Sequence, residues 1–266
     1  ASKSAATIVD VYGKVTAGYV AFTGTSTTAK NVYVMEGADL TVASITLDKA
    51  KLMVQYDENS PGKFTGDVKV GDSAVTAKNV KSFNVEVDKD GLMIVRTVSK
   101  VDDKSAFTVS AGKVAVFYSG LKTTVAAGAE LTSYKDQTSN IYGELVIDGT
   151  VTVANEQEIS AYTVTVKGTL SIADATDSKG AGKFTVNGYL YIGLAKKDVI
   201  KTSGDTASVS GAITGVSVAF VKADATVSEA TIDSFKNDAG VLKSTTYIVE
   251  DKDWMTVYDR TGAYNI

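Results

Sequence analysis

The sequence contains neither histidine nor cysteine in 266 residues. Histidine is the most common general base and metal ligand in proteins, and cysteine supplies thiolate ligands and disulfides. Their joint absence excludes a disulfide framework and closes most routes to a zinc or copper site. We therefore expect a chain without a cofactor or metal, and we expect it not to be an enzyme.

Proline and arginine are also scarce. Pro61 is the single proline, and Arg96 and Arg260 are the only arginines. The formal net charge is -4, with lysines interleaved among acidic residues, so no basic stripe is available for nucleic acid. No apolar run approaches the roughly 18 residues that a membrane span needs, which predicts no transmembrane segment.

The residues that are abundant indicate β-structure. Hydrophobic residues make up 44% of the chain, and there are 23 glycines. Valine, threonine and tyrosine are frequent. Branched and aromatic residues favour strands, and glycine, asparagine and aspartate must make the turns when proline is rare. This composition predicts an all-β protein.

One phrase recurs within residues 141–193. Gly143, Gly149, Gly168 and Gly188 each precede a short run such as GELVI, GTVTV, GTLSI or GYLYI. The aliphatic residues stand two and four places after the glycine, which is the alternation of a strand with one inward face. We expect each glycine to allow a turn at a φ angle that other residues resist.

Glycine-led runs of this kind occur along the whole chain at intervals of 20–31 residues, beginning at Gly13, Gly37, Gly66, Gly91, Gly112, Gly143, Gly168, Gly188, Gly211 and Gly240. A repeat of that length with period-two alternation predicts a parallel β-helix-like solenoid. The predicted core consists of the inward aliphatic residues Val68, Val70, Met93, Val95, Val114, Val116, Leu145, Ile147, Leu170, Ile172, Leu190 and Ile192.

We predict a single elongated β domain over 1–266, with a subdivision into an irregular half (1–120) and a β-helical half (141–266). A β-sandwich or mixed β-architecture stays open for the first half. Asp90 and Gly91 predict a hairpin, and 57–64 predicts a loop. The segment 228–238 is the one expected helix.

Three acidic turns, at 87–91, 101–104 and 174–180, have carboxylates spaced as in calcium loops but lack the full pattern. We interpret them as ordinary turns. Tyr189 and Tyr191 are expected on the outer face, where sugar binding, cross-strand packing and a subunit interface all remain open.

The phrases GELVIDGTVTV, GTLSI and FTVNGYLYIG resemble runs in secreted adhesin-like and surface-layer β-solenoid proteins of archaea and bacteria. The resemblance implies a cell-envelope structural subunit, extracellular, whose partners are copies of itself and cell-envelope glycans. The shared motif is structural and identifies no active residue. A start without methionine suggests a mature secreted chain, although a trimmed chain would look the same.

Two functions follow as hypotheses. The first is self-assembly into a surface layer, sheath or filament, because a solenoid exposes unpaired backbone groups at its end rungs. The predicted joint contains Ile8, Val9 and Val11, or Tyr247, Trp254 and Tyr258. The alternative is a secreted β-helical protein that binds or cleaves polysaccharide.

Overall fold

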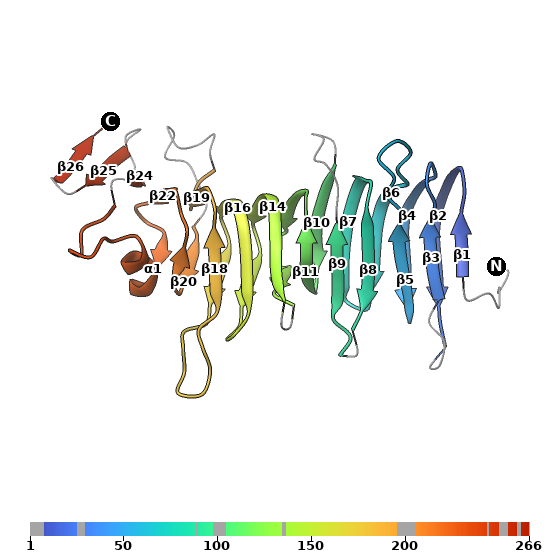
Figure 1. Cartoon of the computed structure of the whole chain (residues 1–266), viewed down its shortest axis with the longest axis horizontal. Coiled ribbons are helices and arrows are strands. Elements are labelled where there is room, and N and C mark those ends of the chain that lie inside the picture. The colour runs from blue at the N-terminus through green and yellow to red at the C-terminus, as the bar shows by residue number, and fades with distance from the viewer. Residues whose placement is uncertain are drawn as a thin grey trace.

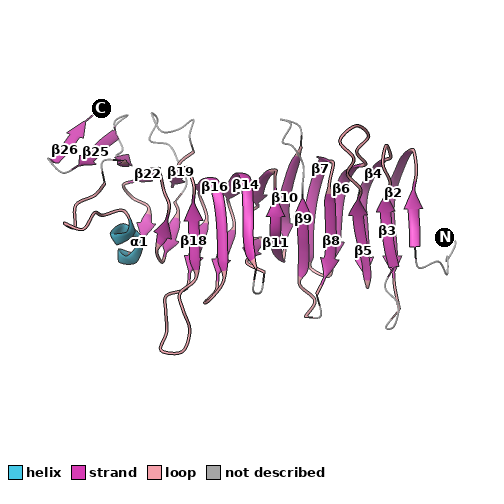
Figure 2. Ribbon diagram, viewed as in Figure 1, coloured by secondary structure: helices cyan, strands magenta, loops and turns pink. Residues whose placement is uncertain are grey.

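The computed structural model describes residues 8–25, 30–88, 90–97, 105–134, 137–195, 206–243 and 245–249, and the backbone of 255–259 and 262–265. It is a β-solenoid of about eight turns with stacked parallel strands. Figure 1 shows an elongated molecule with β1 at one end and β26 at the other, and Figure 2 shows one short helix among the strands. The predicted solenoid fold is confirmed.

The first part of the chain contains β1 (Ile8–Val11), β2 (Lys14–Thr23), β3 (Lys30–Val34), β4 (Asp39–Asp48), β5 (Ala50–Val54), β6 (Lys63–Val70), β7 (Ser73–Val80), β8 (Phe83–Val87), β9 (Met93–Thr97), β10 (Ala106–Ala111), β11 (Lys113–Ser119), β12 (Lys122–Val125) and β13 (Glu130–Thr132).

The second part contains β14 (Thr138–Ile147), β15 (Thr150–Val153), β16 (Glu158–Val166), β17 (Thr169–Ile172), β18 (Lys183–Val186), β19 (Tyr189–Ile192), β20 (Ser208–Ser210), β21 (Ile213–Thr214), β22 (Val218–Lys222), β23 (Thr226–Val227), α1 (Glu229–Ser234), β24 (Thr246–Val249), β25 (Met255–Asp259) and β26 (Gly262–Asn265).

Parallel strands of the second half stack in three columns. One column is β13–β15–β17–β20–β23. The long strands β14 and β16 contribute to both others, because their pairing breaks between Ile141 and Glu144. Their first halves continue into β18 and β21, and their second halves into β19, β22 and β24. Each turn of the solenoid therefore presents three strands around a common core.

The first half combines parallel and antiparallel pairs. β1–β3–β5 and β2–β4–β6 are parallel, but β7 pairs antiparallel with β6 and β10, and β8 pairs antiparallel with β5 and β9. A tight turn at Gly71 and Asp72 causes the reversal, since Val70 lies directly opposite Ser73. The alternative of mixed β-structure in this half is thus partly realised inside one solenoid.

A single sheet runs through the entire molecule. Its strand order is β2–β4–β6–β7–β10–β12–β14–β16–β19–β22–β24–β25–β26. Only β7 and β25 run against the common direction, so β26 and β2 point the same way. The two outer strands of this sheet lie at opposite ends of the molecule (Figure 1).

The inward aliphatic residues form the core as predicted. Eleven of the twelve predicted residues are buried, and Val70 is partly buried and packed against the same cluster. Leu145, Leu170 and Leu190 are 0% exposed, whereas Thr169 and Ser171, on either side of Leu170, are partly exposed. Phenylalanines fill the core between the reversed strands, where the Phe64 and Phe83 rings stack with centroids 5.6 Å apart.

Four glycines of the repeat are required for a different reason from the one predicted. Gly143, Gly149, Gly168 and Gly188 do not have positive φ angles. A Cβ at Gly168 would lie 2.1 Å from the Gly149 carbonyl oxygen and 2.5 Å from that of Asp148. The residue must be glycine because consecutive turns of backbone stack too closely for a side chain. The turn-angle explanation was therefore wrong for these four, although it holds for Gly112 and several others.

The predicted hairpin, loop and helix are present, but the loop ends before Lys63, where β6 begins, and the helix covers only Glu229–Ser234. Asp88 begins the β8–β9 hairpin, and its carboxylate accepts hydrogen bonds from the backbone N–H groups of Asp90 and Leu92. α1 begins after Ser228, whose hydroxyl oxygen accepts from the Thr231 N–H at 3.3 Å. These are an Asx turn and an N-cap, both readable from the sequence.

Candidate assembly edge and surface pocket

The first turn of the solenoid has an unpaired edge. β1 pairs with β3 on one side, and β2 pairs with β4 on one side; no other described strand pairs with either. Natural edge strands are usually blocked by charges, proline or bulges. β1 and β2 contain only Asp10 and Lys14 as charged residues and no proline. The edge is therefore chemically suited to accept another strand.

The apolar core is also incompletely covered at this end. Val9 and Val11 stack on Val32 and Val34, which are both 0% exposed, yet they are themselves only partly buried. In β2, Val15 is 37% exposed while its neighbour Leu40 is 5% exposed. Ile8 is 54% exposed. The predicted joint residues Val9 and Val11 thus lie on the open end of the core, whereas Ile8 lies on the outer side of the same strand.

The other predicted joint residues lie at the opposite end, in a different setting. Tyr247 belongs to β24, which is paired along both edges, and its ring stacks on Phe220 with centroids 5.0 Å apart. Tyr258 lies on β25 opposite Thr246. Trp254 lies outside the described residues. Among the described strands, the free edge at this end belongs to β26, one strand beyond Tyr258.

Two of the three columns end beneath α1. The Thr231 hydroxyl donates to the Gly211 carbonyl, and the Gly211 N–H donates to the Ser228 hydroxyl at 3.1 Å. Phe235, directly after the helix, is 3% exposed and joins the main core. α1 thus covers the core at this end, and among the described strands only the sheet that ends in β26 continues past it. The two ends of the solenoid are chemically unequal.

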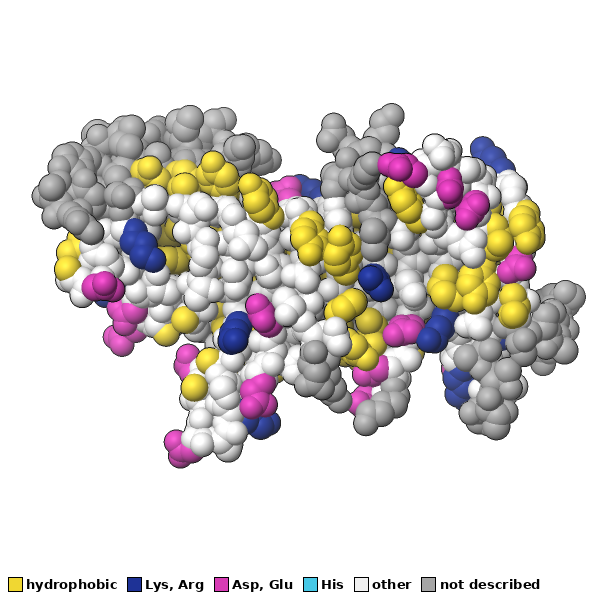
Figure 3. Space-filling model, viewed as in Figure 1, with side chains coloured by type: hydrophobic (Ala, Val, Ile, Leu, Met, Phe, Trp, Pro, Cys, Tyr) yellow, Lys and Arg dark blue, Asp and Glu magenta, His cyan; other side chains and the backbone are white. Residues whose placement is uncertain are grey.

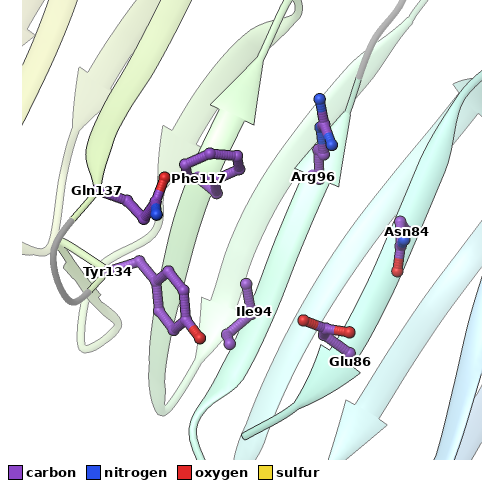
Figure 4. Close-up of a pocket in the computed structure, with 7 residues that line it drawn as sticks. All are labelled: Asn84, Glu86, Ile94, Arg96, Phe117, Tyr134 and Gln137. Atoms are coloured by element: carbon purple, nitrogen blue, oxygen red, sulfur yellow. The ribbon is translucent and has the colours of Figure 1, made fainter.

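A pocket of about 350 Å³ lies on the outer surface midway along the solenoid. It is lined by Asn84 and Glu86 from β8, Ile94 and Arg96 from β9, Phe117 from β11, and Tyr134 and Gln137 from the β13–β14 connection. Figure 4 shows Tyr134 and Gln137 on one side of the recess and Asn84 and Glu86 on the other. No motif pointed to this pocket, because its residues come from four separate segments.

The topology explains the recess. β11 pairs with β13 through residues 113–115 and with β14 through Tyr118 and Ser119. Its pairing with β9 is irregular between Val116 and Tyr118. Phe117 therefore occupies the point where one column divides into two. Tyr134 and Gln137 line the same pocket, and the Gln137 N–H donates a hydrogen bond to the Tyr134 carbonyl.

Charges in the pocket are unevenly compensated. The Glu86 carboxylate forms an ion pair with Lys51, with Oε2 and Nζ 2.7 Å apart. Arg96 is exposed and has no carboxylate partner among the described residues. Its guanidinium carbon lies 5.6 Å from the centroid of the Phe117 ring and 5.9 Å from that of Tyr118. Cation–π contacts orient this charge but do not neutralise it.

The two expected outer tyrosines differ. Tyr189 is 45% exposed, but Tyr191 is 3% exposed and its ring stacks on Phe220 with centroids 5.2 Å apart. Burial, with smaller contributions from Tyr189 and Glu144, raises the pKa of the Tyr191 hydroxyl above its ordinary value. Cross-strand packing explains Tyr191, whereas Tyr189 stays available at the surface.

The two described acidic turns lie in separate connections, β8–β9 and β17–β18. The carboxylate of Asp88 is engaged by its own hairpin, and the 174–180 loop closes through hydrogen bonds between Thr176 and Lys179. Residues 101–104 are outside the described part of the chain. In the part that is described, no three acidic residues gather in a way that would hold a metal ion.

Comparisons of the chain with protein-family models, curated proteins and solved structures find no match. None of the described helices has the length and apolar character required to cross a membrane.

Proposed function

We propose that this protein is an extracellular structural subunit that assembles end to end into a cell-surface layer, sheath or filament. The observation that carries the proposal is the open first turn, where no described strand pairs with the β1–β2 edge and the core residues of β1 and β2 are only partly buried. Its residues are apolar and nearly uncharged, which favours strand addition by a second chain. The role is structural and includes no catalytic step.

Directions of the strands favour a head-to-tail contact. The continuous sheet begins at β2 and ends at β26, and these strands run the same way. A second copy translated along the axis would therefore place its β2 beside β26 as a parallel pair, the pairing that most of the sheet already uses. A contact between unlike surfaces that repeats by translation along the axis does not close into a ring, and so it produces a filament.

A matched pair of substitutions tests this contact. Val20 is partly buried and packs on Ile45, whereas Ala21, next to it, is exposed. Val20→Lys would place a charge in the uncovered core cross-section, a device that natural edge strands use against pairing. Ala21→Lys adds the same charge on the same strand but on the solvent side.

We expect the unaltered chain and Ala21→Lys to form polymers in negative-stain microscopy, with a mass in sedimentation that rises with protein concentration. Val20→Lys should remain a folded monomer with the β-type circular dichroism spectrum of the unaltered chain. Polymers of Val20→Lys, or a monomeric unaltered chain at high concentration, would refute assembly through this edge.

A further inference from the structure

The pocket on β8, β9 and β11 has the features of a binding site, and the assembly edge does not involve it. Its volume of about 350 Å³ lies within the range of small-molecule sites. Apolar and aromatic surface comes from Ile94, Phe117 and Tyr134, and polar groups come from Asn84, Arg96 and Gln137. Such sites typically combine an apolar lining with a few convergent polar groups.

The charge of the pocket selects an anion. Lys51 neutralises Glu86, so the guanidinium of Arg96 supplies the uncompensated charge among the described lining residues. Arginine is always protonated and presents a planar set of donors that matches a carboxylate. The Phe117 and Tyr118 rings hold this guanidinium in place, which lowers the entropy lost when a ligand binds.

The remaining polar groups suit a ligand with several hydroxyl groups. Asn84 and Gln137 carry amides, which both donate and accept hydrogen bonds, and Tyr134 carries a hydroxyl. The Asn84 Oδ1 atom is buried without a hydrogen-bond partner. A buried acceptor left unsatisfied costs free energy, and a ligand hydroxyl that donates to this atom would remove the cost.

We propose that this pocket binds a uronic-acid residue of an acidic polysaccharide. The carboxylate of the sugar pairs with Arg96, its hydroxyl groups bond to the amides of Asn84 and Gln137, and its apolar ring face packs on Tyr134. An aromatic side chain offers an apolar face and a polar tip in one group, as a sugar does.

A line of exposed tyrosines extends the site beyond one sugar. The rings of Tyr118 and Tyr142 are in contact, with centroids 4.9 Å apart. Tyr142 and Tyr162 lie at the same bend of adjacent strands and are 60% and 54% exposed. Figure 3 shows hydrophobic side chains in an oblique line across this face. The next sugars of the same chain would stack on these rings.

Calorimetric titration of the full chain with trigalacturonate and with its fully methyl-esterified form tests the proposal. The two ligands differ in carboxylate charge and share the sugar rings. We expect measurable binding of the acid and at least tenfold weaker binding of the ester. Galacturonic acid alone should bind more weakly than the trimer, because it cannot reach Tyr142.

Variants locate the site. Arg96→Gln should weaken trigalacturonate binding at least tenfold, whereas Lys183→Gln, which removes an exposed charge on β18, should leave it unchanged. Tyr142→Ala should weaken the binding of trigalacturonate but not that of galacturonic acid. The melting temperature and circular dichroism of each variant establish that it is folded.

The proposal would be overturned by no binding of the acid, by equal binding of acid and ester, or by full binding to Arg96→Gln. A hexamer of glutamate that binds as tightly as trigalacturonate would reject the sugar in favour of an acidic peptide. Each outcome is independent of filament formation, because the pocket lies away from β1, β2 and β26.

Discussion

Single residues stabilise this solenoid in two ways, by filling its core and by allowing its backbone turns to approach. Leu170 is 0% exposed and stacks between Val151 and Val209 on the neighbouring turns. At Gly168, two positions earlier, carbonyl oxygens of the preceding turn leave no room for a Cβ. The repeat phrase encodes both requirements within three residues.

Truncation of Leu170 tests the first requirement. Leu170→Ala should lower the free energy of unfolding by about 2–5 kcal/mol, because it removes apolar contacts and leaves a cavity. Ser171→Ala, on the outer face, should change it by less than about 0.5 kcal/mol. Denaturant titration of both variants measures the difference, and equal effects would contradict the assignment of inner and outer faces.

Addition of one carbon tests the second requirement. Gly168→Ala should destabilise the protein by about 1–3 kcal/mol, because the clashing atoms belong to the backbone and cannot rotate away. Gly18 has no atom within 4 Å of its added Cβ and no positive φ angle. Gly18→Ala should therefore be neutral or slightly stabilising. Thermal melts compare the two, and a tolerated Gly168→Ala would disprove close stacking as the reason for this glycine.

Tyr191 provides a test by pH. Because burial raises its pKa, the folded chain keeps the hydroxyl proton at pH values where the unfolded chain loses it, from about pH 10 upward. The unfolded state then binds fewer protons, so the free energy of unfolding falls as pH rises through this window. Tyr191→Phe should make the decline shallower in melts between pH 9 and 11. An equally steep decline would show that Tyr191 does not contribute.

At the scale of elements, α1 distinguishes the closed end of the core from the open one. The helix has six residues, too few to be stable in isolation, and its cap and the burial of Phe235 hold it in place. The Ser228 hydroxyl serves both the Thr231 N–H and the Gly211 N–H. One side chain therefore joins the helix to the last turns of the solenoid.

Removal of this cap should be measurable. Ser228→Ala should cost about 0.5–2 kcal/mol of unfolding free energy, and Ser228→Asn should recover most of it, since asparagine is an equally good N-cap. Denaturant unfolding provides the comparison. A variant with asparagine that is as unstable as the alanine variant would mean that the hydroxyl acts through something other than the cap.

Elements also show how much of the structure was readable from sequence. Strands, core positions and α1 depend on neighbours within a few residues, and alternation, glycine spacing and the SEATIDSF cap encode them. The reversal at β7 was missed although Gly71 and Asp72 form a two-residue hairpin signal. The pocket has no local signal, because Arg96, Phe117 and Tyr134 meet only through the register shift in β11.

At the scale of the whole molecule, one sheet extends from an open edge to a second edge with the same strand direction. The predicted joint residues Ile8, Val9 and Val11 lie at the open end, and β26 lies beyond Tyr247 and Tyr258 at the other. A filament built on this sheet would be a continuous array of strands, and its stability would depend on protein concentration.

Absence of cysteine makes the central claim directly measurable. Ala21 lies on β2 and Ala263 on β26. Head-to-tail assembly places the two strands of neighbouring copies side by side, within the Cα separations of about 4.4–6.8 Å that a disulfide spans when the residues are in register. Each double variant carries Ala21→Cys and a second cysteine at one of the positions 262–265. The double variants and the corresponding single variants are oxidised in parallel. The account predicts that at least one double variant forms a covalent ladder of many subunits in denaturing electrophoresis, while every single variant runs as an uncrosslinked chain. Covalent dimers from Ala21→Cys alone, with no ladder from any double variant, would show head-to-head pairing and contradict it.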